Sequence, residues 1–567
     1  MTAVPDHPFK RIALCCSGGG YRAASFHLGA MAYLHRLRFQ GRPLLENVKS
    51  LSTVSGGTIT GVVYALKCRQ GHTFPEIYSF LVEKLSSVDL VREGLNKLNV
   101  HSEWENPGKR RNLINAFSEI YDREFTGGET FDIFENMDNT HLEEVMFNST
   151  EFSSGLIFRF QNDGRFGNYY NPVRRDLGGE VKLADIIAAS SCFTGGFEPI
   201  EWPQDFIHSE SVELKEAAPL LSSLGLMDGG IYDNQGIDSI LLSEERTGAE
   251  AFDLILVSDV TSPYMKPFLF LEKKPETGWR NWTPGFLKAR LRQIYQWFNW
   301  FLIVSLVCIS AYLIFYFSND LLSGILLATG IFLLCFKIIL TFARKKLEKG
   351  LKSSVRYIRK ALSDDLPLDG LASLKFSRIP FHHLEALLLD RINSLVSLVG
   401  EVFLKTVRRL VYGRLYDSDQ HLFRRAANLI QALTRRDFES NRNRNLNDPA
   451  FFQNIPGCDP RLIGDYDQVV GNRLESIVDT AATFGTNLWF TETDKMQNVL
   501  PNLIISGQAT MCFTLLKYLV ELRHTPNNGY RNLPPHLQQD IEDLWQQCIA
   551  DWQQFKTSPE FMMPANN

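Results

Sequence analysis

The chain has 567 residues, of which 44% are hydrophobic and 22% are charged, and its formal net charge is −5. These values are typical of globular proteins and supply enough apolar material for two or three structural units. The weak negative charge, without a basic segment that carries interleaved aromatic residues, argues against a nucleic-acid-binding protein.

The nine cysteines show no metal-type spacing, and those in apolar surroundings are Cys15, Cys16, Cys192, Cys308, Cys335 and Cys512. Buried free thiols are therefore expected, in a compartment that keeps them reduced. The first residues lack the basic and then apolar profile of a secretory signal. We expect no metal and no other cofactor.

The first predicted strand, residues 11–16, leads into the turn Ser-Gly-Gly-Gly-Tyr-Arg at 17–22. Residues 23–34 are apolar at helical spacing and predict a helix. Backbone N–H groups in a glycine-rich turn between a strand and a helix bind negative charge. The charge is either a bound phosphate or the oxyanion of an acyl-transfer intermediate.

A second strand–turn–helix pattern follows at residues 48–66. The predicted strand, residues 48–54, leads into a turn with Ser55 and Gly57, and a helix continues from residue 58. A serine on a tight turn flanked by small residues is typical of a nucleophile elbow. The oxyanion-binding turn and this serine together indicate a serine acyl hydrolase.

Two further motifs lie downstream: Ala-Ala-Ser-Ser-Cys-Phe-Thr-Gly-Gly-Phe-Glu-Pro at 188–199 and Met-Asp-Gly-Gly-Ile-Tyr-Asp-Asn at 227–234. With the two turns, these motifs resemble the patatin-like phospholipases, especially the branch shared with cytosolic phospholipase A enzymes. The four motifs occur in the family's order over about the first 235 residues, and together they are specific. One departure is Thr53, which replaces the first glycine of the usual Gly-x-Ser-x-Gly elbow and crowds it with a β-branched side chain.

The resemblance implies an α/β fold of three layers, with a mostly parallel central sheet and helices on both faces. It implies a catalytic dyad in which Asp228, with its pKa raised by burial, acts as the base for Ser55. Arg22 matches the arginine that contacts the lipid phosphate in the cytosolic phospholipase A branch, and a structural salt bridge is the alternative. The implied oxyanion donors and motif glycines are Gly18, Gly19, Gly20, Gly57, Gly229 and Gly230.

Other interpretations of these motifs remain open. The histidines fall in no triad motif, and His27, which follows the glycine-rich turn, is expected to be structural. Asp228 before two glycines is also a common turn signal. A membrane-anchored scaffold without activity, a neutral-lipid lipase and a lysophospholipase are alternatives to a phospholipase. A nucleotide-binding module is disfavoured, because the turn lacks the Lys-Ser/Thr and Gly-x-Gly-x-x-Gly patterns.

Two apolar segments, residues 297–317 and 321–342, flank a short polar turn at 318–320. About 20 residues of helix cross a hydrocarbon core, so the pattern predicts a transmembrane hairpin, with Lys337 extending outward at its end. Basic residues lie at both outer ends and not in the turn, which places both ends in the cytoplasm. These residues are Lys288, Arg290, Arg292, Arg344, Lys345, Lys346 and Lys349.

Residues 351–438 are helical in pattern and basic, which favours either contact with anionic lipid or an ordinary solvated face. We expect an integral membrane protein with its catalytic domain in the cytoplasm, acting on membrane lipid in the bilayer, and of undetermined oligomeric state. The expected layout is catalytic core 1–270, juxtamembrane segment 271–296, hairpin 297–342, basic helical insertion 343–450, remaining core 451–535 and helical tail 536–567.

Overall fold

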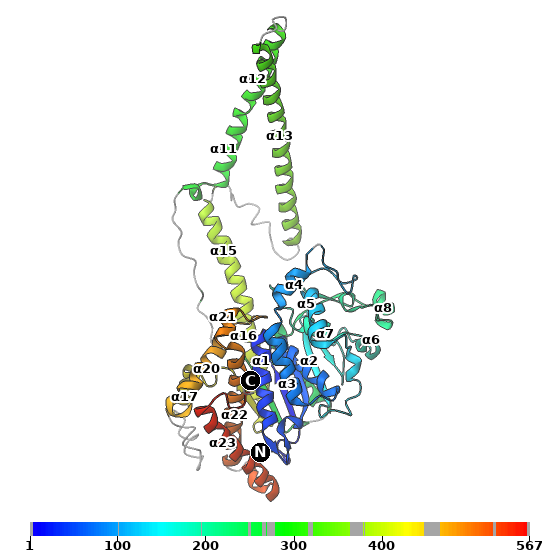
Figure 1. Ribbon diagram of the computed structural model, residues 1–567, viewed down its shortest axis with the longest axis vertical. Helices are drawn as coiled ribbons and strands as arrows, with labels where there is room; N and C mark the ends of the chain where they lie inside the picture. Colours follow the sequence, from blue (N-terminus) through cyan, green and yellow to red (C-terminus); the bar gives the residue numbers. More distant parts are fainter. Residues whose placement is uncertain are drawn as a thin grey trace. The chain divides into compact units, whose positions relative to one another are not determined.

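The computed structural model describes residues 4–99, 101–193, 195–247, 251–262, 268, 278–315, 321–362, 378, 380–446, 465–525 and 529–563. The chain divides into two compact units (Figure 1). The first unit combines Met1–Lys266 with Val399–Asn567, and the second is Pro267–Leu398. The chain therefore leaves the first unit after Lys266 and returns to it at Val399.

In the described residues, the first unit contains an eight-stranded sheet in the order β10-β9-β1-β4-β5-β8-β7, with β6 paired to β5. Strands β10, β9, β1, β4 and β5 run parallel, whereas β6, β7 and β8 pair antiparallel with their neighbours. The strands are β1 (Ile12–Cys16), β4 (Val48–Val54), β5 (Glu144–Glu151), β6 (Ile157–Gln161), β7 (Ile200–Trp202), β8 (Leu224–Asp228), β9 (Leu254–Asp259) and β10 (Arg425–Leu429). The predicted α/β fold with a mostly parallel central sheet is confirmed.

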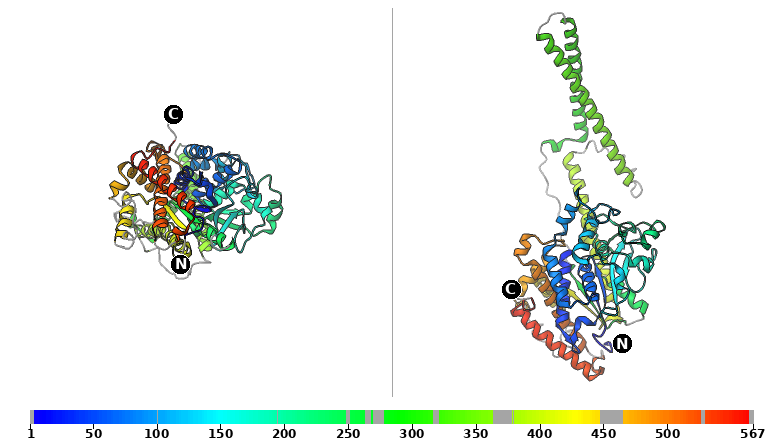
Figure 2. Two further views of the ribbon diagram at one scale, coloured as in Figure 1. Left: turned by 90° about the horizontal axis from the view of Figure 1, so that it is seen from below. Right: turned by 45° about the vertical axis from the view of Figure 1, so that its right-hand side comes forward.

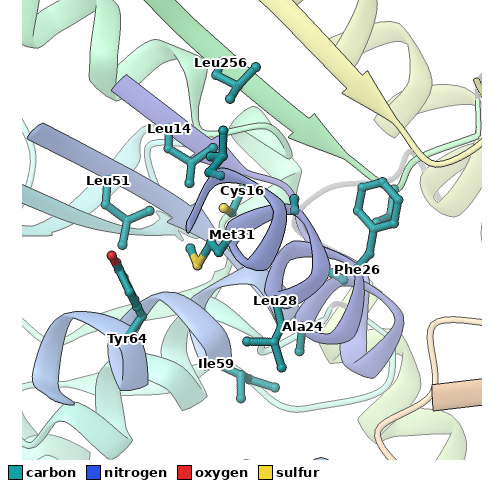
Figure 3. Close-up of a cluster of buried hydrophobic side chains, with 14 of the residues drawn as sticks. Leu14, Cys16, Ala24, Phe26, Leu28, Met31, Leu51, Ile59, Tyr64 and Leu256 are labelled. Carbon is teal, nitrogen blue, oxygen red and sulfur yellow. The ribbon is translucent and has the colours of Figure 1, made fainter. Parts of the chain in front are cut away.

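One face of this sheet is covered by α1 (Gly20–Arg36), α2 (Gly56–Arg69) and α22 (Val499–His524). Strand side chains such as Leu14, Leu51 and Leu256 point toward α1 and α2, whose apolar residues meet them (Figure 3). These helices begin directly after β1 and β4, so the packing of this layer sets the position of both turns.

The helix α22 packs against α1 with backbone in contact with backbone. A Cβ added at Gly29 would lie 2.0 Å from the Ile504 carbonyl oxygen, and one at Gly507 would lie 2.1 Å from that of Phe26. Among the described residues α22 is one of three helices long and apolar enough to cross a membrane, but 89% of its apolar window is buried. It is a core helix of the first unit.

The opposite face of the sheet is covered by α10 (Ile237–Thr247) and α16 (Leu404–Tyr416). Val411 and Leu415 of α16 pack with Ala13 and Cys15 of β1. Residues 404–416 were expected to belong to a basic insertion, and they instead form part of the core. Hydrophobic contact with the sheet is the physical reason.

The expected boundary near residue 450 is therefore too late. The compact first unit resumes at Val399, and β10 adds to the sheet by parallel pairing with β9. The expected tail from residue 536 contributes α23 (Pro535–Thr557), whose Trp552 and Phe555 are buried in the main core.

The first unit has further elements, which connect the layers described above or pack against them (Figure 2). They are β2 (Arg38–Phe39), β3 (Arg42–Pro43), α3 (Phe74–Ser87), α4 (Leu90–Lys97), α5 (Leu113–Tyr121), α6 (Arg175–Gly179), α7 (Leu183–Ser190), α8 (Glu213–Ala217), α9 (Gly230–Asp233), α17 (Arg435–Leu446), α19 (Tyr466–Val469), α20 (Asn472–Thr483) and α21 (Glu492–Met496).

The second unit is helical, with α11 (Pro284–Trp297), α12 (Asn299–Phe315), α13 (Leu321–Leu362) and α15 (Phe381–Ser397). Two stretches in it are long and apolar enough to cross a membrane, Gly285–Ile314 and Gly324–Lys346, and only 6% and 11% of their windows are buried. The turn expected at 318–320 lies outside the described residues.

The two apolar helices α12 and α13 lie side by side in both views (Figures 1 and 2). The Ser305 hydroxyl donates to the Gly330 carbonyl oxygen at 2.7 Å, and small residues at this crossing allow close approach. Lys337 was expected to extend outward. It is instead buried, donating to Asn299 Oδ1 at 2.6 Å with its ammonium 3.8 Å from the Tyr295 ring centroid.

Candidate active site

The carboxyl ends of β4 and β8 meet along one strand, β5. Val54, the last residue of β4, pairs with Asn148, and Asp228, the last residue of β8, pairs with the next residue, Ser149. Since β4 is parallel and β8 antiparallel to β5, the two strands approach this point from opposite directions. This register brings Ser55 and Asp228 together.

Ser55 occupies the turn between β4 and α2 in a strained conformation. Its φ of 51° and ψ of −123° lie in a region that residues with a Cβ rarely adopt. The Ser55 N–H donates to Ser190 Oγ at 2.9 Å, and Ser190 Oγ donates to the Asn148 carbonyl oxygen at 2.6 Å. Ser190 of the 188–199 motif thus stabilises the turn at Ser55, a role that the sequence of the motif did not indicate.

Thr53, the departure from the usual elbow, fits because of two compensating residues on α2. Its hydroxyl pairs with Thr58 Oγ1 at 2.9 Å. Its methyl group lies against Gly61, where an added Cβ would come within 2.4 Å of it. The absence of a side chain at Gly61 therefore leaves room for the Thr53 methyl group.

Asp228 is buried, with 5% of its surface exposed. Burial raises the pKa of Asp228 to about 6, while hydrogen bonds from the Ser55 side chain and the Gly230 amide oppose the rise. The Gly230 N–H donates to Asp228 Oδ1 at 2.7 Å. A carboxylate with this pKa is ionised at neutral pH and still able to accept a proton.

The motif glycines permit close backbone contacts around Ser55 and Asp228. A Cβ at Gly57 would lie 2.7 Å from the Cys16 and Ser17 carbonyl oxygens. The two turns are therefore in close backbone contact at this glycine. One at Gly229 would lie 2.4 Å from the Asn148 carbonyl oxygen. Any larger side chain would push these segments apart.

The glycine-rich turn lies beside Ser55, because a Cβ at Gly18 would come within 2.8 Å of Ser55 Cβ. Gly19 and Gly20 have φ values of 146° and 59°, which favour glycine. Gly18 was expected to be an oxyanion donor, but its N–H donates to the Asn234 carbonyl oxygen at 3.0 Å. In the described part of the chain, the amides of Gly19 and Gly20 have no hydrogen-bond acceptor, so both are available as donors.

Asn234 is a site residue that sequence reasoning quoted within a motif but did not single out. Its side-chain oxygen lies 2.5 Å from the Cβ positions of both Gly18 and Gly230. Its amide nitrogen donates to Thr261 Oγ1 at 2.7 Å. Asn234 therefore joins the glycine-rich turn to the turn that carries Asp228.

Arg22 is partly buried and comes directly after the glycine-rich turn and Tyr21 in the chain. Its Nη1 donates to the Phe484 carbonyl oxygen at 2.7 Å, whereas its buried Nε has no partner in the described residues. Burial lowers the pKa of Arg22 to about 10, and Asp259 opposes this change. The described residues include no acidic partner within salt-bridge distance of Arg22, so the alternative of a structural salt bridge has no support there.

The segment before α21 covers the glycine-rich turn from the C-terminal part of the chain. The Tyr21 N–H donates to the Asn487 carbonyl oxygen at 2.8 Å, and the Phe484 and Phe490 rings stack at 5.3 Å. No motif marks this segment, because it contributes backbone carbonyl groups and apolar side chains.

His27 has the structural role expected of it. Its buried ring bonds to the Ser17 carbonyl oxygen and to Ser258 Oγ, both at 2.9 Å. Burial lowers the pKa of His27 to about 4, so the ring is neutral. The described residues also contain no group of three His, Cys, Asp or Glu side chains able to hold a metal ion.

Residues 14–241 match the Patatin family, described as patatin-like phospholipase. This segment is therefore a patatin-like phospholipase domain, of a family of lipid acyl hydrolases. Ser55 and Asp228 lie within the matched residues, and the expected family resemblance is confirmed there. The comparison with curated proteins gives no significant match.

Proposed function

We propose that this chain is a membrane-anchored serine acyl hydrolase that cleaves carboxylic esters of phospholipids through a Ser55–Asp228 dyad. The observation that carries the proposal is that Ser55 follows β4 at the point where β8 ends in Asp228, a buried aspartate whose pKa is raised to about 6. Such an aspartate can remove the hydroxyl proton without a histidine.

In the proposed reaction, Asp228 accepts the Ser55 proton while Oγ attacks the ester carbonyl carbon. The carbonyl electron pair moves to the oxygen, and the amides of Gly19 and Gly20 donate to it. Each such donor contributes about 3 kcal/mol in other hydrolases. The alcohol leaves with the proton from Asp228, and water then repeats the sequence to release the fatty acid and restore Ser55.

A phosphorylated lipid is favoured over a neutral lipid because of Arg22. Its unpartnered Nε lies 3.8 Å from the Cβ position of Gly19, next to the proposed oxyanion donors. A guanidinium group suits phosphate oxygens. A neutral-lipid lipase would not need this cation.

Membrane anchoring through α12 and α13 rests on their length, their apolar composition and their exposed side chains. Basic residues flank the hairpin on both outer sides, and the segment between the two helices has none. The positive-inside rule therefore favours a cytoplasmic catalytic unit.

A fluorophosphonate probe tests the reaction, because it labels only an activated serine. We expect the full-length protein to be labelled and to hydrolyse phospholipid in bilayers, and the Ser55→Ala protein to do neither. Ser86→Ala, which changes a serine at the end of α3, is the control. This variant should still be labelled by the probe and should still hydrolyse phospholipid. Absence of labelling in the folded parent protein would favour the inactive scaffold.

Headgroup-resolved lipidomics with the parent and Ser55→Ala proteins identifies the substrate. Accumulation of diacyl phospholipids in the variant is the expected result. Accumulation of lysophospholipids or of neutral glycerides alone would instead support a lysophospholipase or a lipase. For a lipase, whose substrate carries no phosphate, Arg22→Met should leave hydrolysis unchanged, whereas a phospholipase or a lysophospholipase should lose affinity for its substrate.

A further inference from the structure

The helix α16 presents two polar side chains to the carboxyl end of β9. Asp259, the last residue of that strand, accepts hydrogen bonds from Arg408 Nε at 2.9 Å and from the Tyr412 hydroxyl at 3.0 Å. Asp259 has no exposed surface, and Arg408 is 8% exposed. This is a buried ion pair between residues 149 positions apart.

A continuous set of hydrogen bonds connects Asp259 to the glycine-rich turn. Asp259 Oδ1 accepts from the Thr261 N–H at 2.7 Å, and Thr261 Oγ1 accepts from Asn234 Nδ2 at 2.7 Å. The Asn234 carbonyl oxygen then accepts the Gly18 N–H at 3.0 Å. Each step uses a short bond among described residues of the first unit.

A second connection reaches the turn that follows Asp228. Arg414 of α16 forms an ion pair with Asp238. The Asp238 and Gln235 backbone N–H groups donate to the two carboxylate oxygens of Asp233, at 2.7 and 2.9 Å. Gln235 Nε2 also lies 3.3 Å from Asp259 Oδ2, which joins the two connections.

We propose that α16 is a positioning element for the oxyanion site, with Arg408 and Tyr412 as positioning residues that act through Asp259, Thr261 and Asn234. Their function is to keep the amides of Gly19 and Gly20 aligned with Ser55. The inference rests on the proposed hydrolase function. It also explains why polar residues occupy a helix that otherwise buries apolar side chains against the sheet.

The chain supplies a matched control in Arg424. This arginine is also buried, pairs with the carboxylate of Glu244 and donates to the Phe252 carbonyl oxygen. Within the described residues, its bonds do not lead to the glycine-rich turn. Arg408→Met and Arg424→Met each remove one buried cation and leave one buried carboxylate, so both should lower the melting temperature.

The experiment compares both variants of the full-length protein in detergent on a soluble short-chain ester. We expect Arg408→Met to lower kcat about tenfold with little change in KM, because a misaligned oxyanion donor affects the transition state. Arg424→Met should retain kcat. Arg408→Lys, which keeps the positive charge, should recover part of the loss.

Hydrogen exchange of the amides in residues 17–22 gives a readout that does not depend on turnover. We expect faster exchange in Arg408→Met than in Arg424→Met at equal distance below their melting temperatures. This result would support the positioning role even if the parent protein hydrolysed no ester, which would contradict only the proposed function.

Tyr412→Phe covers the case in which Arg408→Met does not fold, since it removes one hydroxyl and retains the ion pair. It should lower kcat severalfold and speed exchange at 17–22. Equal kcat and equal exchange in Tyr412→Phe and the parent protein, or equal losses in Arg408→Met and Arg424→Met, would overturn the proposal.

Discussion

Asp228 and Asp259 are both buried at the ends of strands, but their neighbours shift their pKa values in opposite directions. Burial raises the pKa of Asp228 to about 6, because the loss of water disfavours the charged form. Burial acts in the same direction on Asp259, but the charge of Arg408 and further hydrogen bonds bring the pKa of Asp259 below its ordinary value. The first aspartate is suited to proton transfer and the second to holding structure.

The raised pKa of Asp228 predicts a specific pH dependence of hydrolysis. Asp228 must be unprotonated to accept the Ser55 proton, so kcat/KM should rise about tenfold per pH unit below pH 6 and level off above it. The measurement is a pH profile on a short-chain ester whose own chemistry does not titrate in this range. A profile without an inflection between pH 5 and 7 would contradict Asp228 as the base.

The dyad also predicts non-additive mutant effects. Ser55→Ala and Asp228→Asn should each lower kcat by about 10⁴-fold, and the double variant should be no worse than either one. The check is a set of kcat values for the parent, the two single variants and the double variant on one substrate. Independent, multiplying losses would mean that the two residues serve different steps.

At the scale of elements, the contact of α1 with α22 sets the position of the glycine-rich turn, since α1 begins at that turn. Gly507 has no room for a side chain there, so Gly507→Ala should lower stability by about 1–3 kcal/mol through overpacking. Thermal unfolding in detergent measures this loss.

Gly400→Ala is the matched control for this substitution, because nothing lies within 4 Å of the Cβ position of this helical glycine. It should leave the melting temperature unchanged or raise it slightly. Equal melting temperatures for the two variants would show that the α1–α22 contact is not as close as described.

At the scale of the whole molecule, the first unit has its own sheet and core, made of Met1–Lys266 and Val399–Asn567. Replacing residues 267–398 by a flexible linker should therefore release a soluble protein that still hydrolyses a dispersed short-chain ester. Its activity on intact bilayers should fall, because the protein then has to find the surface from solution. Sedimentation and the two activity assays test this prediction.

A longer deletion, of residues 267–450, provides the control. It removes α16 and β10 and exposes the apolar residues that they cover, so insoluble protein is the expected result. A soluble and active product from this longer deletion would contradict the assignment of α16 and β10 to the catalytic unit.

The orientation of the hairpin predicts which side of the membrane carries the enzyme. Its basic flanks should remain in the cytoplasm, together with the catalytic unit. Protease added to sealed vesicles with the cytoplasmic face outward should digest the catalytic unit, and protease added to intact cells should not. Digestion from the outer face of cells would reverse the assignment.

The features that could be predicted from the sequence depend on residues that lie close together in the chain. The two strand–turn–helix patterns, Ser55 and the Asp-Gly-Gly turn at Asp228 are short motifs, because each turn needs particular residues at fixed spacing. The α/β fold class follows from the same alternation of elements. The two long apolar segments were also recognisable, since their length is a local property.

Which residues pair with each other follows from the packing of segments that are far apart in the chain. The Gly18 amide is occupied by Asn234, and Arg408 pairs with Asp259 across 149 positions. An arginine among leucines has the same pattern whether it faces water, lipid or a buried carboxylate. Likewise α22 is as apolar as a membrane span, but contact with α1 buries it. Spacing along a chain does not record such partners, because they depend on how distant segments pack.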